Sequence, residues 1–235
     1  MSRIGVFGGM GPAATVDFMD KLVRLTPAKR DQEHLPVVVA SFPHVHDRSR
    51  AILGVGPDPL PQLLAGIDFL NEAMVGVIAI PCNSSHHWYA QMSARAKAPI
   101  LHIADACVAA IAAGTEKVAI FATRGALASG FYQRALQARG LGWLVPPEEG
   151  AQGNVDDCIR YVKAGELAEG SASLDEALKW ARSQRAGAVI MGCTEIPIAA
   201  REATVQGLQL VDSSLELARA TVNHALERGW NQWDS

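Results

Sequence analysis

The segment 78–86 reads Ile78-Ala79-Ile80-Pro81-Cys82-Asn83-Ser84-Ser85-His86, an apolar run that ends in a cysteine and continues at once with amide and hydroxyl residues. A second segment has the same plan and reads Ala188-Val189-Ile190-Met191-Gly192-Cys193-Thr194-Glu195. Both patterns predict a buried strand with a cysteine at its carboxyl end, followed by a helix. Open α/β sheets place their ligands at this end of the strands, so both cysteines are candidate functional residues.

Other features of the first half of the chain recur in the second half at nearly the same spacing. Cys82 and Cys193 are 111 residues apart, and Arg48 and Lys163 are 115 residues apart. Two longer segments recur at offsets of 114 and 107 residues, namely Ile4–Gly11 with Val118–Gly125, and Ile100–Asp105 with Leu208–Asp212. The repetition predicts an α/β protein of two pseudo-duplicated lobes, each contributing one cysteine and one cation to a shared active-site cleft.

Strand and helix patterns alternate nearly throughout the chain. The expected strands are 3–8, 36–41, 76–81, 99–102, 117–122, 142–145, 187–191 and 208–211. The expected helices are 12–25, 61–74, 85–95, 104–113, 126–139, 153–164, 172–184 and 213–227. Val, Ile and Ala dominate most strands without clean alternation, which is typical of parallel strands buried on both faces. We expect a mainly parallel sheet flanked by helices in each lobe. The first lobe is predicted at 1–100 with a returning helix in 209–235, and the second at 101–208.

The composition is that of a folded, water-soluble protein. Of the 235 residues, 49% are hydrophobic and 19% charged, which excludes general disorder. A net charge of −3 without a Lys/Arg cluster predicts no basic surface that would bind nucleic acid. No apolar run approaches the roughly 18 residues of a membrane span, and the N-terminus does not resemble a signal peptide. We therefore expect a cytoplasmic protein that binds neither nucleic acid nor membrane.

The cysteine and histidine spacings predict no metal site. The four cysteines lie far apart in the sequence, so they form neither a zinc motif nor a secreted disulfide framework. Cys107 and Cys158 lie within helical patterns and are expected to be buried small hydrophobic residues. The histidines supply no helical pair four residues apart with a third ligand nearby.

The glycine-rich turn Gly8–Thr15 offers a nucleotide-binding alternative, because Gly9, Gly11 and Ala14 satisfy the pattern G-x-G-x-x-A. The second predicted strand, however, is followed by Phe42-Pro43-His44 and has no acid at its end for a ribose hydroxyl. The turn fits better as a close backbone approach to a small anion at a helix N-terminus.

Two strand-end thiols and two cations suit one particular reaction. One thiol can take a Cα proton while the other delivers a proton to the opposite face, which inverts the carbon. A cation or a helix N-terminus beside a thiol favours the thiolate. Two nearby thiolates repel each other, so the resting pair is expected to share one proton. Arg48 also fits a solvated loop, but two cations facing one cleft favour a ligand with two carboxylates.

Several motifs together resemble a known family from Ile4 to about Ala225. They are Gly8–Pro12 with Ala14-Thr15, Thr26–His34, Pro81–Asn83, Lys163–Gly165 and Gly192–Glu195. They are similar to those of the cofactor-independent aspartate/glutamate racemases, with aspartate racemases as the nearest likeness. The resemblance implies Cys82 and Cys193 as the acid/base pair and Arg48 and Lys163 as ligands of the substrate carboxylates. It further implies that no pyridoxal phosphate or metal is used, that the protein is a homodimer, and that the substrate pocket is lined by Met10, Asn83, Ser84, Ser85, Thr123 and Thr194.

One departure from the family pattern concerns the residues after Asn83. The family usually reads Thr-Ala-His there, whereas this chain reads Ser84-Ser85-His86 and then His87-Trp88. The hydroxyl of Ser85 and the bulk of Trp88 bear on the choice between aspartate, glutamate and a broader range. Three alternatives remain open at this point. They are a two-lobed dicarboxylate-binding protein without turnover, a one-cysteine decarboxylase or isomerase of the same fold, and a cysteine hydrolase using His86.

Overall fold

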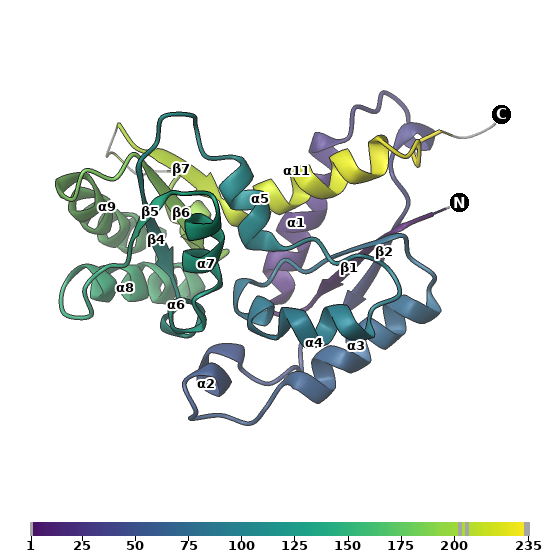
Figure 1. Cartoon of the computed structure of the whole chain (residues 1–235), viewed down its shortest axis with the longest axis horizontal. Helices are drawn as coiled ribbons and strands as arrows, with labels where there is room; N and C mark the ends of the chain where they lie inside the picture. Colours follow the sequence, from purple (N-terminus) through teal and green to yellow (C-terminus); the bar gives the residue numbers. More distant parts are fainter. Residues whose placement is uncertain (1, 202–203, 205–206, 233–235) are drawn as a thin grey trace. The chain divides into compact units, whose positions relative to one another are not determined.

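The computed structural model describes residues 2–201, 204 and 207–232. The chain forms two compact units, one of Met1–Ala106 with Ser214–Ser235 and one of Cys107–Ser213. Each unit is an α/β fold with a parallel sheet flanked by helices (Figure 1). Two helices lead the chain from one unit to the other, α5 (Ile103–Ala109) and α11 (Ser213–Leu226).

The sheet of the first unit has three parallel strands in the order β2-β1-β3. They are β1 (Ile4–Gly8), β2 (Val37–Ser41) and β3 (Val77–Ala79). The unit also contains α1 (Pro12–Leu25), α2 (Arg48–Ile52), α3 (Leu60–Glu72), α4 (Tyr89–Arg95) and the 3₁₀ segments η1 (Asp31–Glu33) and η2 (Asn83–Trp88). Helix α1 covers one face of this sheet, and α3 and α4 cover the other (Figure 1). All residues of the central strand β1 are buried, which accounts for its lack of alternation.

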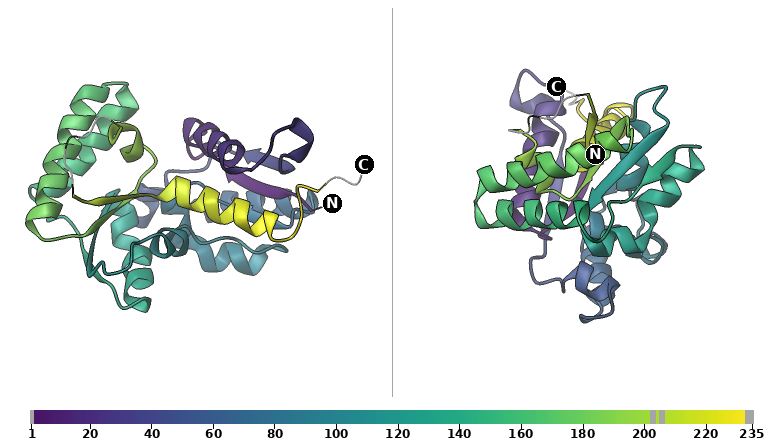
Figure 2. Two further views of the ribbon diagram at one scale, coloured as in Figure 1. Left: turned by 90° about the horizontal axis from the view of Figure 1, so that it is seen from above. Right: turned by 90° about the vertical axis from the view of Figure 1, so that its left-hand side faces the viewer.

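The sheet of the second unit has four parallel strands in the order β5-β4-β6-β7. They are β4 (Lys117–Ala122), β5 (Gly142–Leu144), β6 (Ala188–Gly192) and β7 (Gln209–Asp212). Its helices are α6 (Arg124–Ser129), α7 (Phe131–Ala138), α8 (Ala151–Ala164), α9 (Leu167–Ser183) and α10 (Ile196–Ala199). Helices α8 and α9 lie side by side (Figures 1 and 2) and pack on the sheet face formed by Ala119, Phe121, Val189 and Met191.

The two sheets share one connectivity, as the sequence repetition predicts. In each, the first strand is central, the second pairs on one side of it and the third on the other. The fourth strand of the second unit corresponds in the first unit to a single parallel bridge between Ile78 and Ile100. Cys82 and Cys193 therefore follow equivalent strands, β3 and β6.

Several expected elements differ from the structure. The helix expected at 85–95 is the 3₁₀ segment η2 up to Trp88 and the helix α4 from Tyr89, and the helix expected at 104–113 ends at Ala109. The strand expected at 99–102 is reduced to the bridge at Ile100, because Pro99 lacks an N–H and α5 begins at Ile103. The helix expected at 126–139 is two helices, because Gly130 adopts φ 72° and ends α6. The long loop 43–61 contains α2, whose N-cap Asp47 accepts a hydrogen bond from the Arg50 N–H at 2.9 Å.

Within the described part of the chain, no helix is both long and apolar enough to cross a membrane.

Candidate functional site

Cys82 lies just beyond β3 and is 6% exposed. Its own N–H donates to the carbonyl of Ile80 at 2.8 Å, which turns the chain sharply into η2. The residues after it are Asn83, which is buried, and Ser84, whose hydroxyl lies 3.4 Å from the hydroxyl of Ser49 in α2. The segment that contains Arg48 and Ser49 thus contacts the segment that follows Cys82, so polar groups of both segments can reach one ligand.

Met10 and Ser85 form a buried contact in the same unit. The Ser85 hydroxyl is 0% exposed and donates to the Met10 sulfur at 3.4 Å. Met10 follows the glycine turn after β1, where Gly9 has φ 89° and a Cβ would lie 2.3 Å from the Phe42 nitrogen. The Gly9 N–H donates to the Thr15 hydroxyl at 2.8 Å, so this N–H is not available to bind an anion.

Arg48 is placed beside this turn by three backbone carbonyls. Its Nη1 donates to the carbonyls of Val45 at 2.9 Å and His46 at 3.0 Å, and its Nη2 donates to that of Met10 at 3.2 Å. Its Nε is buried and has no hydrogen-bond partner among the described residues. The guanidinium therefore joins the loop to the turn, and Nε and the second N–H of Nη2 are the donors that remain for a ligand.

The ring of His86 is buried four residues after Cys82. Its Nε2 lies 3.2 Å from the Ile80 carbonyl, and the ring packs edge-on against His102 at 4.9 Å between centroids. Burial, and secondarily His102, lowers the pKa of His86 to about 3. A ring with a pKa of about 3 is too weak a base to take the proton of a thiol near neutral pH, which argues against the cysteine-hydrolase alternative.

The buried His86 ring predicts a pH-dependent loss of stability. Its pKa is about 3 in the folded protein against the usual 6.5. The unfolded chain therefore binds the extra proton as the pH falls below 6.5, and the stabilisation present above that pH is progressively lost. At pH 5 the loss is about 2 kcal/mol. Urea unfolding at pH 7.5 and pH 5 should show this loss in the wild type and not in His86→Gln. An identical pH dependence in both proteins would contradict the assignment.

Trp88 and the two remaining cysteines belong to apolar cores. Trp88 is buried in the core of the first unit, so its bulk serves packing there. Cys107 and Cys158 are both 0% exposed, which confirms the prediction that they are buried residues. Burial, with a contribution from Glu195, raises the pKa of Cys158 to about 12, so it is a thiol at neutral pH.

Cys193 follows β6 in the second unit and is 8% exposed. Its thiol donates to Glu195 Oε2 at 2.9 Å, and the hydroxyl of Thr194 donates to the same oxygen at 3.1 Å. Burial raises the pKa of Cys193 well above its usual range, and the charge and hydrogen bond of Glu195 raise it further. Lys163 acts in the opposite direction but does not outweigh them. Lys163 therefore does not make Cys193 a thiolate in this state, and the sharing of one proton between the two cysteines stays a prediction.

Lys163 and Thr123 lie on elements of the second unit. Lys163 is in the last turn of α8, and its Nζ is 3.9 Å from Glu195 Oε1. Its side chain is 59% exposed, which leaves it able to reach a ligand. The Thr123 hydroxyl follows β4 and accepts a hydrogen bond from the Ala126 N–H at 3.3 Å as the N-cap of α6.

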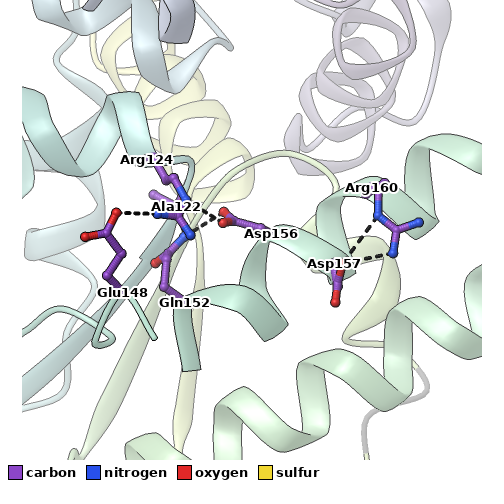
Figure 3. Close-up of polar contacts among 7 residues, drawn as sticks. All are labelled: Ala122, Arg124, Glu148, Gln152, Asp156, Asp157 and Arg160. Carbon is purple, nitrogen blue, oxygen red and sulfur yellow. Dashed lines mark hydrogen bonds and ion pairs between the residues drawn. The ribbon is translucent and has the colours of Figure 1, made fainter. Parts of the chain in front are cut away.

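A polar network at the end of β4 includes residues that the sequence did not indicate. The Gln152 amide donates to the Ala122 carbonyl at 3.2 Å and to Asp156 Oδ1 at 2.8 Å (Figure 3). Arg124 bridges Asp156 and Glu148 at 2.7 and 2.6 Å (Figure 3). The first turn of α8 is thereby fixed to the carboxyl end of β4, while its last turn presents Lys163 to the loop after β6. Arg124 is balanced by two carboxylates and is a poor candidate for a substrate ligand.

The described residues contain no group of three or more His, Cys, Asp and Glu side chains placed to hold a metal ion. Of the predicted site residues, contacts within the first unit join Met10 to Ser85 and to Arg48. Ser84 contacts Ser49, the neighbour of Arg48 in α2, and Cys82 and Asn83 directly precede Ser84 in sequence. The second unit brings together Cys193, Thr194 and Lys163. Glu195, which the sequence analysis quoted only as part of a motif, links all three of these.

Comparison with known proteins identifies relatives over nearly the whole chain. A family profile described as Asp/Glu/Hydantoin racemase matches residues 7–221. The broad specificity amino-acid racemase RacX of Bacillus subtilis (strain 168) is 28% identical over 225 residues, which cover 94% of this chain and 96% of that protein.

Solved structures give the same result for the fold. An aspartate racemase from Picrophilus torridus superposes with a TM-score of 0.82 at 25% identity, covering 99% of this chain and 100% of that one. A glutamate racemase from Francisella tularensis, in complex with D-glutamate, has a TM-score of 0.74 at 18% identity, covering 100% of this chain and 84% of that one. The arrangement of two helix-flanked parallel sheets is common to these proteins.

Proposed function

The chain belongs to the Asp/Glu/hydantoin racemase family and is an amino-acid racemase, and we propose that it interconverts L- and D-aspartate, and also glutamate, without pyridoxal phosphate. The observation that carries the proposal is the equivalent placement of two cysteines. Cys82 and Cys193 each follow the third strand of sheets that share one connectivity, and each is nearly buried.

The proposed mechanism uses these two thiols as acid and base on opposite faces of one Cα. One sulfur takes the Cα proton, and the other gives its proton to the opposite face. Each such transfer contributes about 10²–10⁴-fold to the rate. The remaining acceleration must come from hydrogen-bond donors that stabilise the negative charge developing on the substrate carboxylate. Asn83, Ser84 and Thr194, adjacent to the two thiols in sequence, are the proposed donors.

The acidic substrate is proposed from the two cations. Lys163 is exposed in the last turn of α8, and Arg48 retains an unpartnered buried Nε beside Met10. The likeness to an aspartate racemase over 99% of the chain supports the same choice. A broader substrate range is the second candidate. It is favoured by the RacX relative and by Glu195, whose carboxylate offsets the charge of Lys163.

Chiral chromatography of reactions with single enantiomers tests the substrate proposal. Purified protein freed of pyridoxal phosphate and treated with a chelator should racemise aspartate and glutamate far faster than alanine or serine. Comparable rates on the neutral amino acids would favour the broad-range candidate. Activity that is lost on removing pyridoxal phosphate and restored by adding it would contradict the cofactor-independent mechanism.

The resemblance to racemases of this family also leads us to propose a homodimer. Sedimentation equilibrium should give twice the 25.0 kDa mass of the chain. A monomer at all concentrations would exclude this assembly.

A further inference from the structure

A carboxylate lies in direct contact with one of the two candidate catalytic thiols. Glu195 Oε2 accepts hydrogen bonds from the Cys193 thiol at 2.9 Å and from the Thr194 hydroxyl at 3.1 Å. The Glu195 side chain is 21% exposed, and Cys193 is 8% exposed. The contact is therefore largely shielded from water, where a charge acts more strongly than on the surface.

This contact favours the thiol form of Cys193 over the thiolate. Ionising Cys193 would remove the donated hydrogen bond and place a second negative charge beside Glu195. The charged groups that act on the thiol are Glu195 from its own loop and Lys163 from α8. Lys163 is 3.9 Å from the other Glu195 oxygen and is mostly exposed, so it offsets only part of the carboxylate's effect.

The corresponding place in the first unit carries no charge. Two residues after Cys82 stands Ser84, whose hydroxyl lies 3.4 Å from the Ser49 hydroxyl. Two residues after Cys193 stands Glu195. The duplicated strands thus present two thiols whose immediate neighbours differ by one negative charge, although the sheets around them have the same connectivity.

We propose that Glu195 is a positioning residue that keeps the shared proton of the cysteine pair on Cys193 in the resting enzyme. The inference rests on the proposed two-thiol racemisation. Cys82 is then the base of the resting enzyme. It takes the Cα proton of one enantiomer and forms an S–H bond, while the S–H bond of Cys193 breaks and its proton joins the opposite face of Cα. Cys82 then carries the proton, and the resting form returns when Cys82 releases one proton to solvent and Cys193 takes one from it.

If the proton lies mainly on Cys193, the two enantiomers should differ in KM and in kcat but not in kcat/KM. The enantiomer whose Cα–H faces Cys82 meets the major form of the enzyme. The other enantiomer needs the minor form, so its KM is raised by the low population of that form. Enantiomers have equal free energies, so the ratio kcat/KM must be the same in both directions. The enantiomer with the higher KM must therefore have the higher kcat by the same factor.

The rate of alkylation of each cysteine tests the proposal without relying on turnover. Wild type, Glu195→Gln and Glu176→Gln are treated with iodoacetamide between pH 6.5 and 9.5, and modification of Cys193 and Cys82 is followed by peptide mass spectrometry. Near neutral pH the Cys193 rate should rise about tenfold in Glu195→Gln, because the variant removes a negative charge in contact with the thiol and so favours the reactive thiolate. Glu176→Gln, which removes a surface acid of α9 in the same unit, should match the wild type at both cysteines. In Glu195→Gln the Cys82 rate should fall as the Cys193 rate rises, because the shared proton then lies more often on Cys82.

Two further measurements separate the possible failures. Glu195→Asp keeps the negative charge, so alkylation of Cys193 should stay slow in this variant. The variant also controls for a folding defect in Glu195→Gln. With aspartate as substrate, Glu195→Gln should bring the two KM values and the two kcat values closer together. An unchanged Cys193 alkylation profile in Glu195→Gln would overturn the role of Glu195, even if the enzyme racemises aspartate. A shifted profile in a protein that racemises no amino acid would overturn the proposed function and leave the contact's effect on Cys193 standing.

Discussion

Replacing Cys82 or Cys193 by serine should lower the rate of aspartate racemisation by about 10²–10⁴-fold or more. If each sulfur serves one face of the same Cα, neither can substitute for the other. A serine hydroxyl is too weak an acid to take part in sharing one proton at neutral pH. The measurement is the initial rate of loss of optical purity from each pure enantiomer, followed by chiral chromatography.

Cys107→Ala and Cys158→Ala are the matched controls. Both residues are 0% exposed within helices, and their replacement should lower stability modestly while leaving kcat near the wild-type value. Each active-site variant should still exchange the α-proton of one enantiomer with deuterated water, because one base remains on one face. The enantiomer that exchanges should switch between Cys82→Ser and Cys193→Ser. Full racemase activity in both serine variants would refute the two-thiol mechanism.

Lys163→Ala should raise the KM for aspartate about tenfold or more, because the loss of a charge-assisted hydrogen bond to a carboxylate costs about 1.5–3 kcal/mol. Arg48→Ala should raise it at least as much. The Arg48 guanidinium also bonds the carbonyls of Met10 and Val45, so its loss loosens the loop beside the proposed pocket. Steady-state kinetics with both enantiomers measures each effect.

Lys179→Ala is a close control for Lys163→Ala. Lys179 lies in α9 of the same unit, its side chain is 60% exposed against 59% for Lys163, and it too pairs with a glutamate, Glu176. Its replacement removes the same charge and should leave KM unchanged. If Lys163→Ala behaves like Lys179→Ala, Lys163 is a solvated surface residue and the dicarboxylate proposal loses one of its two cations.

The regular elements that position the candidate site could be predicted because their signals are local. The strand runs 3–8 and 117–122 are apolar after their first residues, Arg3 and Lys117. In the structure β1 and β4 occupy Ile4–Gly8 and Lys117–Ala122, and all their residues except Lys117 are buried. Where the prediction failed, a single residue with a special backbone requirement decided the outcome. Gly130, with φ 72°, divides a helix that composition alone would continue, and Pro99 leaves one bridge where a strand was expected.

The candidate site was less predictable because it depends on contacts between distant residues. Arg48 was expected from the repeat, but its bond to the Met10 carbonyl joins residues 38 positions apart and has no sequence signature. Glu195 reads in sequence as an ordinary acid after Cys193 and Thr194. Only the turn after β6 brings its carboxylate onto the thiol, where it outweighs the effect of Lys163 and favours the protonated form of Cys193.

The contact of the Ser85 hydroxyl could not be predicted from the sequence either. The resemblance to the racemase family implied that Ser85 lines the substrate pocket, yet the folded chain buries it against the Met10 sulfur. In this state it supports another predicted pocket residue, and its contact with substrate stays a prediction. Ser85→Ala tests whether the departure from the family pattern affects the preference between aspartate and glutamate.

The central claim is that two different bases act on opposite faces of one carbon, and deuterium incorporation during early turnover tests it most directly. Wild-type enzyme free of pyridoxal phosphate is given L-aspartate in deuterated water, and both enantiomers are recovered within the first few per cent of reaction. The account predicts that the D-aspartate formed carries deuterium at Cα while the remaining L-aspartate keeps its proton, and the reverse when D-aspartate is the substrate. Starting enantiomer that gains deuterium as fast as product forms would show a single exchanging base and contradict it.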